Sequence, residues 1–397
     1  MSPRYLIVPF TAALLLLAGA PAQASEASAL RAQVQRALAG STASRVAAVV
    51  DVAGLGGIVR DDPDLNLPPA STEKLFTTEA ALRLLGSDYR ERTQLRSAGT
   101  KTGAVLNGDL YLVAGGDPFL TSAELDSLAK AFATRGITTI HGHLVMDDTR
   151  YDRVRHAPGW KPEWVPVESG PLSAMALDDN QWRHDAAYLS DPATPVLAKM
   201  RSDLAARGIK VSTTDATRAP APASAATWAS YASAPLSTVT TRILKDSDNF
   251  AAELLLKELG KVGGAGGTTA EGAKVVRAKT GPGGGISDGS GLSSYDRSSA
   301  MRELILLRGT FADLKAKLPI GCTDGTLKQR FCGTVASGRV YAKTGTLDTG
   351  HALAGWTYTR DGHLVTFCFL LSGFTSGPKT TAAIDRAVVA LAGATVG

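Results

Sequence analysis

The chain has 397 residues, of which 44% are hydrophobic and 20% are charged, and its formal net charge is +5. This composition excludes a mainly disordered chain, and without a run of basic residues it argues against nucleic-acid binding. At about 100 to 200 residues per domain, the length predicts two or three domains, or one large domain with an insertion.

The N-terminal segment has the pattern of a secretory signal peptide. Arg4 precedes an apolar stretch from Tyr5 to Ala20, and Ala22–Ala24 form a small-x-small cleavage pattern before Ser25. An uncleaved membrane anchor is the alternative, but the stretch is short for a span of about 20 residues. We therefore expect a signal peptide at residues 1–24, a periplasmic or other extracytoplasmic location, and no stable membrane span after cleavage.

Hydrophobic periodicity and turn residues predict the elements that follow. Strands are expected at residues 46–53, 110–114, 137–146, 339–347, 352–359 and 363–371. Helices are expected at residues 71–85, 122–134, 249–259 and 379–391. Residues 213–235 are rich in Ala, Thr, Ser and Pro and are expected to form a surface loop or linker.

The three cysteines fall into two groups. Export permits disulfides, and Cys322 and Cys332 lie ten positions apart, so we predict a bridge between them, with two free thiols as the alternative. Cys368 lies in the apolar run 364–371 and is predicted to be a buried, inert thiol. The His and Cys residues do not have the spacing of a zinc site, and no metal is predicted. The alternative is a metal site formed by His141, His143, Asp147 and Asp148.

Three short motifs that carry nucleophilic chemistry occur along the chain. They are Ser-x-x-Lys at Ser71–Lys74, Ser-Asp-Asn at Ser247–Asn249, and Lys-Thr-Gly at Lys343–Gly345, which is followed by Thr346. Each motif alone has low specificity, because further copies occur at residues 127–130, 376–379, 101–103 and 279–281. Only Ser71 begins a predicted helix with its lysine one turn later, and only Lys343 lies in a predicted strand, so we discard the other copies.

These residue types suit covalent catalysis by serine. A serine hydroxyl is a poor nucleophile until a base removes its proton, and a lysine with a lowered pKa can be that base. We therefore expect Ser71 to be the nucleophile and Lys74 the general base, with the charge of Lys343 lowering the pKa of Lys74. Ser247 is expected to relay a proton between the two lysines and the leaving amine.

The remaining motif residues are predicted to bind the substrate. Asn249 can hydrogen-bond a substrate amide, and Gly345 lets an extended peptide approach the strand closely. Lys343, Thr344 and Thr346 can hold a terminal carboxylate, and the backbone N–H groups of Ser71 and Thr346 can form an oxyanion hole. The alternative is that Ser71 is only a helix cap, Lys74 a solvated residue of the first turn, and Ser247–Asn249 a cap for the next helix. A Gly-x-Ser-x-Gly pattern at residues 285–289 lacks the strand-to-helix context of a nucleophile elbow.

The three motifs are together the signature of penicillin-binding proteins and β-lactamases. Other stretches resemble one family, the D-alanyl-D-alanine carboxypeptidases and endopeptidases, which are class C low-molecular-mass penicillin-binding proteins of the penicillin-binding protein 4 type. The stretches are Pro69–Thr77, Gly108–Leu120, Asp288–Ser293, Asp324–Leu327 and Arg339–Leu347.

The resemblance implies an α/β (α+β) fold. Its catalytic part would be a transpeptidase-like domain, an antiparallel sheet flanked by helices, at residues 25–92 and 237–397. One inserted α/β domain would occupy residues 93–236. Larger members nest a third domain in this insertion, for which the chain has no room, so two domains are expected.

The resemblance also implies an activity. It is that of a serine DD-peptidase, which cleaves peptidoglycan stem peptides through a Ser71 acyl-enzyme, needs no cofactor and is acylated by β-lactams. A serine β-lactamase and a non-catalytic cell-wall-binding homologue are the alternatives. Carboxypeptidase and endopeptidase activity stay open, because both cleave a bond that follows D-alanine.

Overall fold

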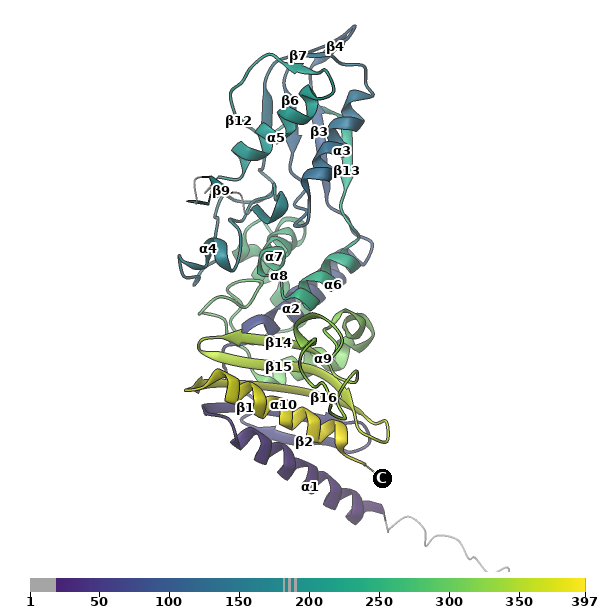
Figure 1. The fold of residues 1–397 in the computed structure, drawn as a ribbon, viewed down its shortest axis with the longest axis vertical. Coiled ribbons are helices and arrows are strands. Elements are labelled where there is room, and N and C mark those ends of the chain that lie inside the picture. Colours follow the sequence, from purple (N-terminus) through teal and green to yellow (C-terminus); the bar gives the residue numbers. More distant parts are fainter. Residues whose placement is uncertain (1–18, 181–182, 185–186, 189–190, 397) are drawn as a thin grey trace, which may run out of the picture.

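The computed structural model describes residues 19–180, 183–184, 187–188 and 191–396. The predicted signal segment lies largely outside these residues, and its predicted cleavage point after Ala24 falls within α1 (Gly19–Ala39). No helix in the described ranges is both long and apolar enough to cross a bilayer. The molecule is elongated, with a sheet built from both ends of the chain at one end and the middle of the chain at the other (Figure 1).

The first sheet joins the two ends of the sequence. Its antiparallel strand order is β14-β15-β16-β1-β2, so β1 near the N-terminus pairs with β16 near the C-terminus. The strands are β1 (Ala43–Val52), β2 (Gly56–Asp61), β14 (Tyr341–Leu347), β15 (Gly350–Tyr358) and β16 (Leu364–Phe374). The four strands predicted for these parts of the chain are confirmed.

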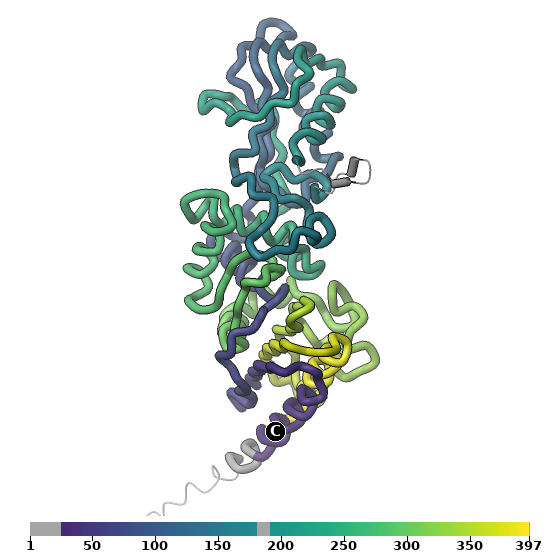
Figure 2. The backbone as a smooth tube through the Cα atoms, turned by 90° about the vertical axis from the view of Figure 1, so that its left-hand side faces the viewer, coloured from purple at the N-terminus to yellow at the C-terminus, as the bar shows by residue number. Residues whose placement is uncertain are grey.

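Helices cover both faces of this sheet. Alternate residues of β16 point to opposite faces: Phe367 and Phe369 share a core with α1 and α10 (Gly377–Gly393), whereas Cys368 and Leu370 lie in the core of the other face. Figures 1 and 2 show α1 and α10 together on one side of the sheet. The helices on the other side are α2 (Glu73–Leu85), α6 (Leu236–Asp246), α7 (Asn249–Gly263), α8 (Thr269–Thr280) and α9 (Ala300–Leu314).

The middle of the chain forms two further sheets. The four-stranded sheet has the order β11-β7-β5-β4, with β4 (Thr100–Thr102), β5 (Val105–Asn107), β7 (Thr139–His141) and β11 (Lys210–Val211). The five-stranded sheet has the order β12-β8-β6-β3-β13, with β3 (Arg92–Ser97), β6 (Leu110–Val113), β8 (Leu144–Asp147), β12 (Thr217–Arg218) and β13 (Ala226–Ala232). A short hairpin joins β9 (Arg183–His184) and β10 (Ala187–Tyr188).

Two predictions for this region are wrong. The single strand expected at residues 137–146 is β7 and β8, which belong to different sheets. The chain changes sheets at Gly142, where a Cβ atom would lie 2.4 Å from the carbonyl oxygen of Gly108, so the two backbones meet too closely for side chains. Residues 213–235 contain β12 and β13 instead of only a loop, because β13 pairs with β3 along its length.

The predicted helix at residues 122–134 is confirmed as α3 (Ser122–Ala133). It packs with α5 (Ala193–Ala205) on a core that also includes Phe250 and Leu254 of α7. The helix α7 therefore lies between the middle of the chain and the first sheet. The domain boundaries given above, 25–92 with 237–397 and 93–236, stay a prediction.

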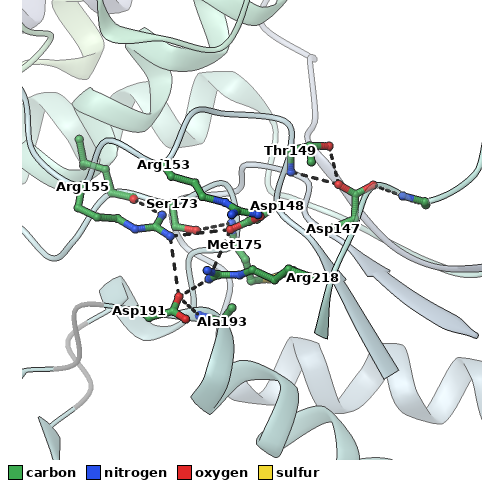
Figure 3. Close-up of polar contacts among 12 residues, drawn as sticks. Asp147, Asp148, Thr149, Arg153, Arg155, Ser173, Met175, Asp191, Ala193 and Arg218 are labelled. Carbon is green, nitrogen blue, oxygen red and sulfur yellow. Dashed lines mark hydrogen bonds and ion pairs between the residues drawn. The ribbon is translucent and has the colours of Figure 1, made fainter. Parts of the chain in front are cut away.

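A network of ion pairs stabilises the middle of the chain around Asp148, directly after β8 (Figure 3). Arg218 of β12 lies 3.5 Å from Asp148, and Arg155 lies 3.9 Å from the same carboxylate and 3.8 Å from Asp191 at the start of α5. The neighbouring Asp147 accepts hydrogen bonds from the backbone of Thr149 and Ala221 instead. Both aspartates weighed as metal ligands thus have structural partners.

One buried carboxylate joins the middle of the chain to α7. Glu258 of α7 is fully buried and accepts hydrogen bonds from Tyr151 Oη at 2.9 Å and Arg150 Nε at 2.8 Å. Tyr89, just before β3, donates to the same carboxylate. The Glu258 carboxylate therefore binds residues from both sides of the predicted domain boundary.

We expect Glu258→Ala to lower the free energy of unfolding by about 3 to 5 kcal/mol, because it leaves the buried Tyr151 hydroxyl and the half-buried Arg150 guanidinium without their partner. Urea unfolding followed by tryptophan fluorescence measures the change. Lys274→Ala is the control, since the Lys274 side chain is 64% exposed and its pair with Glu271 is a surface ion pair, so its loss should cost less than about 1 kcal/mol. Equal losses in the two variants would contradict the importance of Glu258.

Candidate active site

Ser71 lies at the entrance to α2. It belongs to the short 3-10 turn Ala70–Thr72, and α2 follows from Glu73, so the predicted helix at 71–85 is confirmed apart from this tighter first turn. Thr72 fixes the turn, because its Oγ1 atom lies within hydrogen-bond distance of the Pro69 carbonyl oxygen, at 2.8 Å, and of Glu303 Oε1, at 2.9 Å. Ser71 is half-buried and lines a cavity of about 440 Å³.

Lys74 lies one turn after Ser71 and is fully buried. Its Nζ atom lies 2.9 Å from Ser71 Oγ, 2.7 Å from Asn249 Oδ1 and 2.6 Å from the carbonyl oxygen of Ser290. Burial lowers the pKa of Lys74 to about 8, against the opposing charge of Asp288. The structure thus places a lysine with a lowered pKa in hydrogen-bond contact with the predicted nucleophile.

The second motif lies between α6 and α7. Ser247 follows α6 in a left-handed conformation with φ of 60°, and Asp248 caps α7 through the backbone N–H of Ala251 at 2.9 Å. This turn brings Ser247 to the cavity and Asn249 to Lys74. The Nδ2 atom of Asn249 also donates to the carbonyl of Glu168 at 3.0 Å, so the middle of the chain reaches the site.

Lys343 of β14 contacts Ser247 of the second motif. Its side chain is fully buried and donates to Ser247 Oγ at 2.8 Å and to the carbonyl of Thr344 at 3.0 Å. Burial, and then the charge of Lys74, hold the pKa of Lys343 well below its usual range. The two pairs, Ser71 with Lys74 and Ser247 with Lys343, therefore lie side by side as the motifs predicted.

The other motif residues of β14 divide between its two faces. Thr344 and Thr346 line the cavity. Gly345 is buried on the opposite face, where a Cβ atom would lie 2.7 Å from the carbonyl oxygen of Pro69 and 3.1 Å from Ala70 Cβ. In this structure Gly345 therefore lets the turn that carries Ser71 approach β14, a different reason for glycine from the predicted approach of a peptide.

Two buried acidic residues, for which the sequence predicted no role, hold a loop of the site in place. Asp288 is fully buried and accepts backbone hydrogen bonds from Gly291 at 2.6 Å and Ser293 at 2.7 Å, and the indole N–H of Trp160 donates to it at 2.8 Å. Glu253 of α7 accepts from the backbone of Gly289 at 2.7 Å. Together they hold the loop 288–293, whose Ser290 carbonyl contacts Lys74.

A signal for these acids exists in the sequence. Asp288 lies in one of the family-like stretches, and Glu253 interrupts the apolar face of a predicted helix. Burial, and then the charge of the neighbouring Asp288, raise the pKa of Glu253 to about 8. An acid on a buried helical face indicates a polar partner in the core, but the sequence does not identify the partner.

The predicted disulfide is present between Cys322 and Cys332, whose Cα atoms lie 4.9 Å apart. Cys368 is buried as predicted. The bridged segment reaches the site, because Thr326 Oγ1 lies 2.8 Å from Thr344 Oγ1 and Arg330 lines the cavity. Across the described ranges, no group of three or more His, Cys, Asp or Glu residues could hold a metal ion.

Comparison with solved structures identifies the fold. Penicillin binding protein 4 from Haemophilus influenzae superposes with a TM-score of 0.81 at 21% identity, over 89% of this chain and 98% of that one. A second structure of that protein, complexed with a β-lactam, gives a TM-score of 0.75 at the same identity and coverage. The fold is therefore the penicillin-binding transpeptidase-like fold expected from the sequence.

The sequence comparisons give the family. A profile of the D-Ala-D-Ala carboxypeptidase 3 (S13) family matches residues 30–188 and 185–394, and the chain belongs to this family of serine DD-peptidases. A D-alanyl-D-alanine carboxypeptidase from Actinomadura sp. (strain R39) is 30% identical over 87% of this chain and 80% of the relative.

We expect Gly345→Ala to slow acylation by penicillin at least about tenfold, because the new methyl group displaces the turn that carries Ser71. Overpacking of this kind costs about 1 to 3 kcal/mol of stability. The acylation rate with a fluorescent penicillin measures the effect. Gly266→Ala is the control, since no atom lies within 4 Å of its added Cβ; equal rates in both variants would contradict this role of Gly345.

Proposed function

We propose that the protein cleaves the D-alanyl bond of peptidoglycan stem peptides through an acyl-enzyme on Ser71. The observation that carries the proposal is the hydrogen bond of 2.9 Å between the fully buried Lys74 Nζ and Ser71 Oγ. The solved complex of the relative with a β-lactam supports acylation of the same site by these antibiotics. The motif residues supply the reacting groups, so no cofactor takes part.

The surroundings of Lys74 suit a neutral amine. A neutral lysine has two N–H donors and one lone pair, and two of its three neighbours, Asn249 Oδ1 and the Ser290 carbonyl, can only accept. The lone pair is then left for the third neighbour, the hydroxyl of Ser71, which can donate. Neutral Lys74 therefore takes the proton of Ser71 as the serine oxygen attacks the carbonyl of the penultimate D-alanine.

The second pair of residues handles the leaving group. When the tetrahedral intermediate collapses, the C–N bond breaks and the amine of the leaving residue needs a proton. Ser247, which accepts a hydrogen bond from Lys343 at 2.8 Å, can give its hydroxyl proton to this amine while it takes up the proton that Lys74 removed from Ser71, so that Lys74 becomes neutral again. Neutral Lys74 next removes a proton from the water that attacks the ester carbonyl. It returns this proton to Ser71 Oγ as the bond between Ser71 and the acyl group breaks.

The substrate would lie along β14. Thr344 and Thr346 face the cavity and offer hydroxyl groups to a carboxylate, and Asn249 offers its amide to the substrate backbone. The backbone N–H groups of Ser71 and Thr346 would bind the oxyanion. Both a free D-Ala-D-Ala end and a cross-link after D-alanine fit this arrangement.

The place of action follows from the same chemistry. Stem peptides lie outside the cytoplasmic membrane, and the pattern Arg4, Tyr5–Ala20, Ala22–Ala24 is that of an export signal. We therefore propose that the mature enzyme begins at Ser25 and works in the periplasm or another extracytoplasmic compartment of the envelope.

We expect one penicillin molecule to bind covalently per wild-type chain and none per chain of Ser71→Ala. Intact-protein mass spectrometry measures the adduct, and release of D-alanine from a pentapeptide measures the peptidase activity. Ser127→Ala, in a discarded copy of the motif, is the control and should keep both. Labelling of the Ser71→Ala variant would overturn the assignment of the nucleophile.

We expect the acylation rate to depend on pH through Lys74. Because the neutral amine is the base and its pKa is about 8, the rate should rise about tenfold per pH unit below pH 8 and level off above it. Stopped-flow acylation between pH 6 and 9.5 measures the profile. A rate that is constant over this range would exclude Lys74 as the base.

A further inference from the structure

Arg330 is a cation of the cavity wall that the motifs do not include. The cavity that holds Ser71 has two charged lining residues, the exposed carboxylate of Glu168 and the guanidinium of Arg330. Lys343 is not among the lining residues and is fully buried, with its ammonium on Ser247 and the Thr344 carbonyl. Arg330 is therefore the cationic side chain of the cavity lining that a bound carboxylate can contact.

Two contacts fix the guanidinium so that one edge stays open. Asp385 of α10 accepts hydrogen bonds from Arg330 Nε, at 3.1 Å to its nearer oxygen, and from Nη2. In the described part of the chain, no hydrogen-bond acceptor contacts Nη1, and 19% of the Arg330 side chain is exposed. Asp385 thus accepts from one edge of the guanidinium, Nε and Nη2, and leaves the two N–H donors of Nη1 free.

The disulfide segment sets where this open edge lies. Cys322 N donates to the carbonyl of Arg330 at 2.8 Å, so the bridge between Cys322 and Cys332 closes a loop around Arg330 itself. Thr326 in the same loop lies 2.8 Å from Thr344 Oγ1 on β14. Arg330 is therefore held on the same wall as the hydroxyl groups expected to meet a carboxylate.

We propose that Arg330 binds the carboxylate of the leaving residue through Nη1. This inference rests on the proposed function of the site. The ligand is an α-carboxylate next to the bond that breaks, which a terminal D-alanine, a D-centred cross-link and a penicillin all carry. Asp385 and the disulfide loop act as positioning groups that keep the guanidinium in place when the cavity is empty.

The test compares two substrates that differ only at this carboxylate. They are a blocked tripeptide ending in D-Ala-D-Ala and the same peptide with a C-terminal amide. We expect Arg330→Gln to lower kcat/KM for the acid by about 10- to 100-fold, the range of a hydrogen bond to a charged group. The amide, which has no charge to lose, should change by less than about threefold.

Lys328→Gln is the matched control. It removes a cation two residues away in the same loop, outside the lining of the cavity, and should leave both substrates unchanged. Arg330→Lys retains a cation near Asp385 and should recover part of the preference for the acid. If thermal melting shows that Arg330→Gln does not fold, the comparison of the acid and amide substrates is made with Arg330→Lys instead.

Equal losses on acid and amide, or no loss on either, would overturn the inference, because Arg330 would then only support the fold or have no role. Failure of the proposed function looks different. In that case the wild-type chain releases no D-alanine from the acid substrate, and Ser71 forms no adduct with penicillin.

Discussion

The structure depends on the burial of two lysine side chains, Lys74 and Lys343, each of which is hydrogen-bonded to a serine of the motifs. An isolated charge is expensive to remove from water, so Lys74 and Lys343 each need fixed partners, and burial lowers both pKa values. The partners come from four separate elements: the turn before α2, the α6–α7 junction, the loop 288–293 and β14. If any of these elements moved, a buried amine would lose a hydrogen-bond partner. The contacts that position the catalytic groups are therefore the same contacts that stabilise the core.

The middle of the chain takes part in this requirement. Trp160 donates to Asp288, which holds the loop that contacts Lys74, and the carbonyl of Glu168 accepts from Asn249. Glu258 then ties α7 to Tyr151. The segment between the first two motifs is therefore more than a passive insertion, because its contacts hold Asn249 and the loop 288–293 of the site.

The sequence predicted which elements carry the motif residues, because these predictions use only neighbouring positions. Ser71 and Lys74 are one helical turn apart, and Lys343 lies in a strand with a clear apolar pattern. The contact of Gly345 with Pro69 could not be predicted, because it joins segments more than 270 positions apart in the sequence. For the same reason residues 137–146 read as one strand. Their hydrophobic pattern is continuous, and only the pairing of β7 and β8 with strands of different sheets shows that they are two strands.

The pairing of β1 with β16 sets the order in which a growing chain can become an enzyme. Ala43 pairs with Phe374, so the first strand to be synthesised waits for one of the last. A chain that has grown as far as α9 already contains Ser71, Lys74, Ser247 and Asn249, yet it lacks Lys343 and the strand that covers β1. Non-local pairing of this kind forms slowly. Such a chain lacks Lys343, so the four motif residues that it already contains do not make up the complete site until the C-terminal strands have joined the N-terminal one.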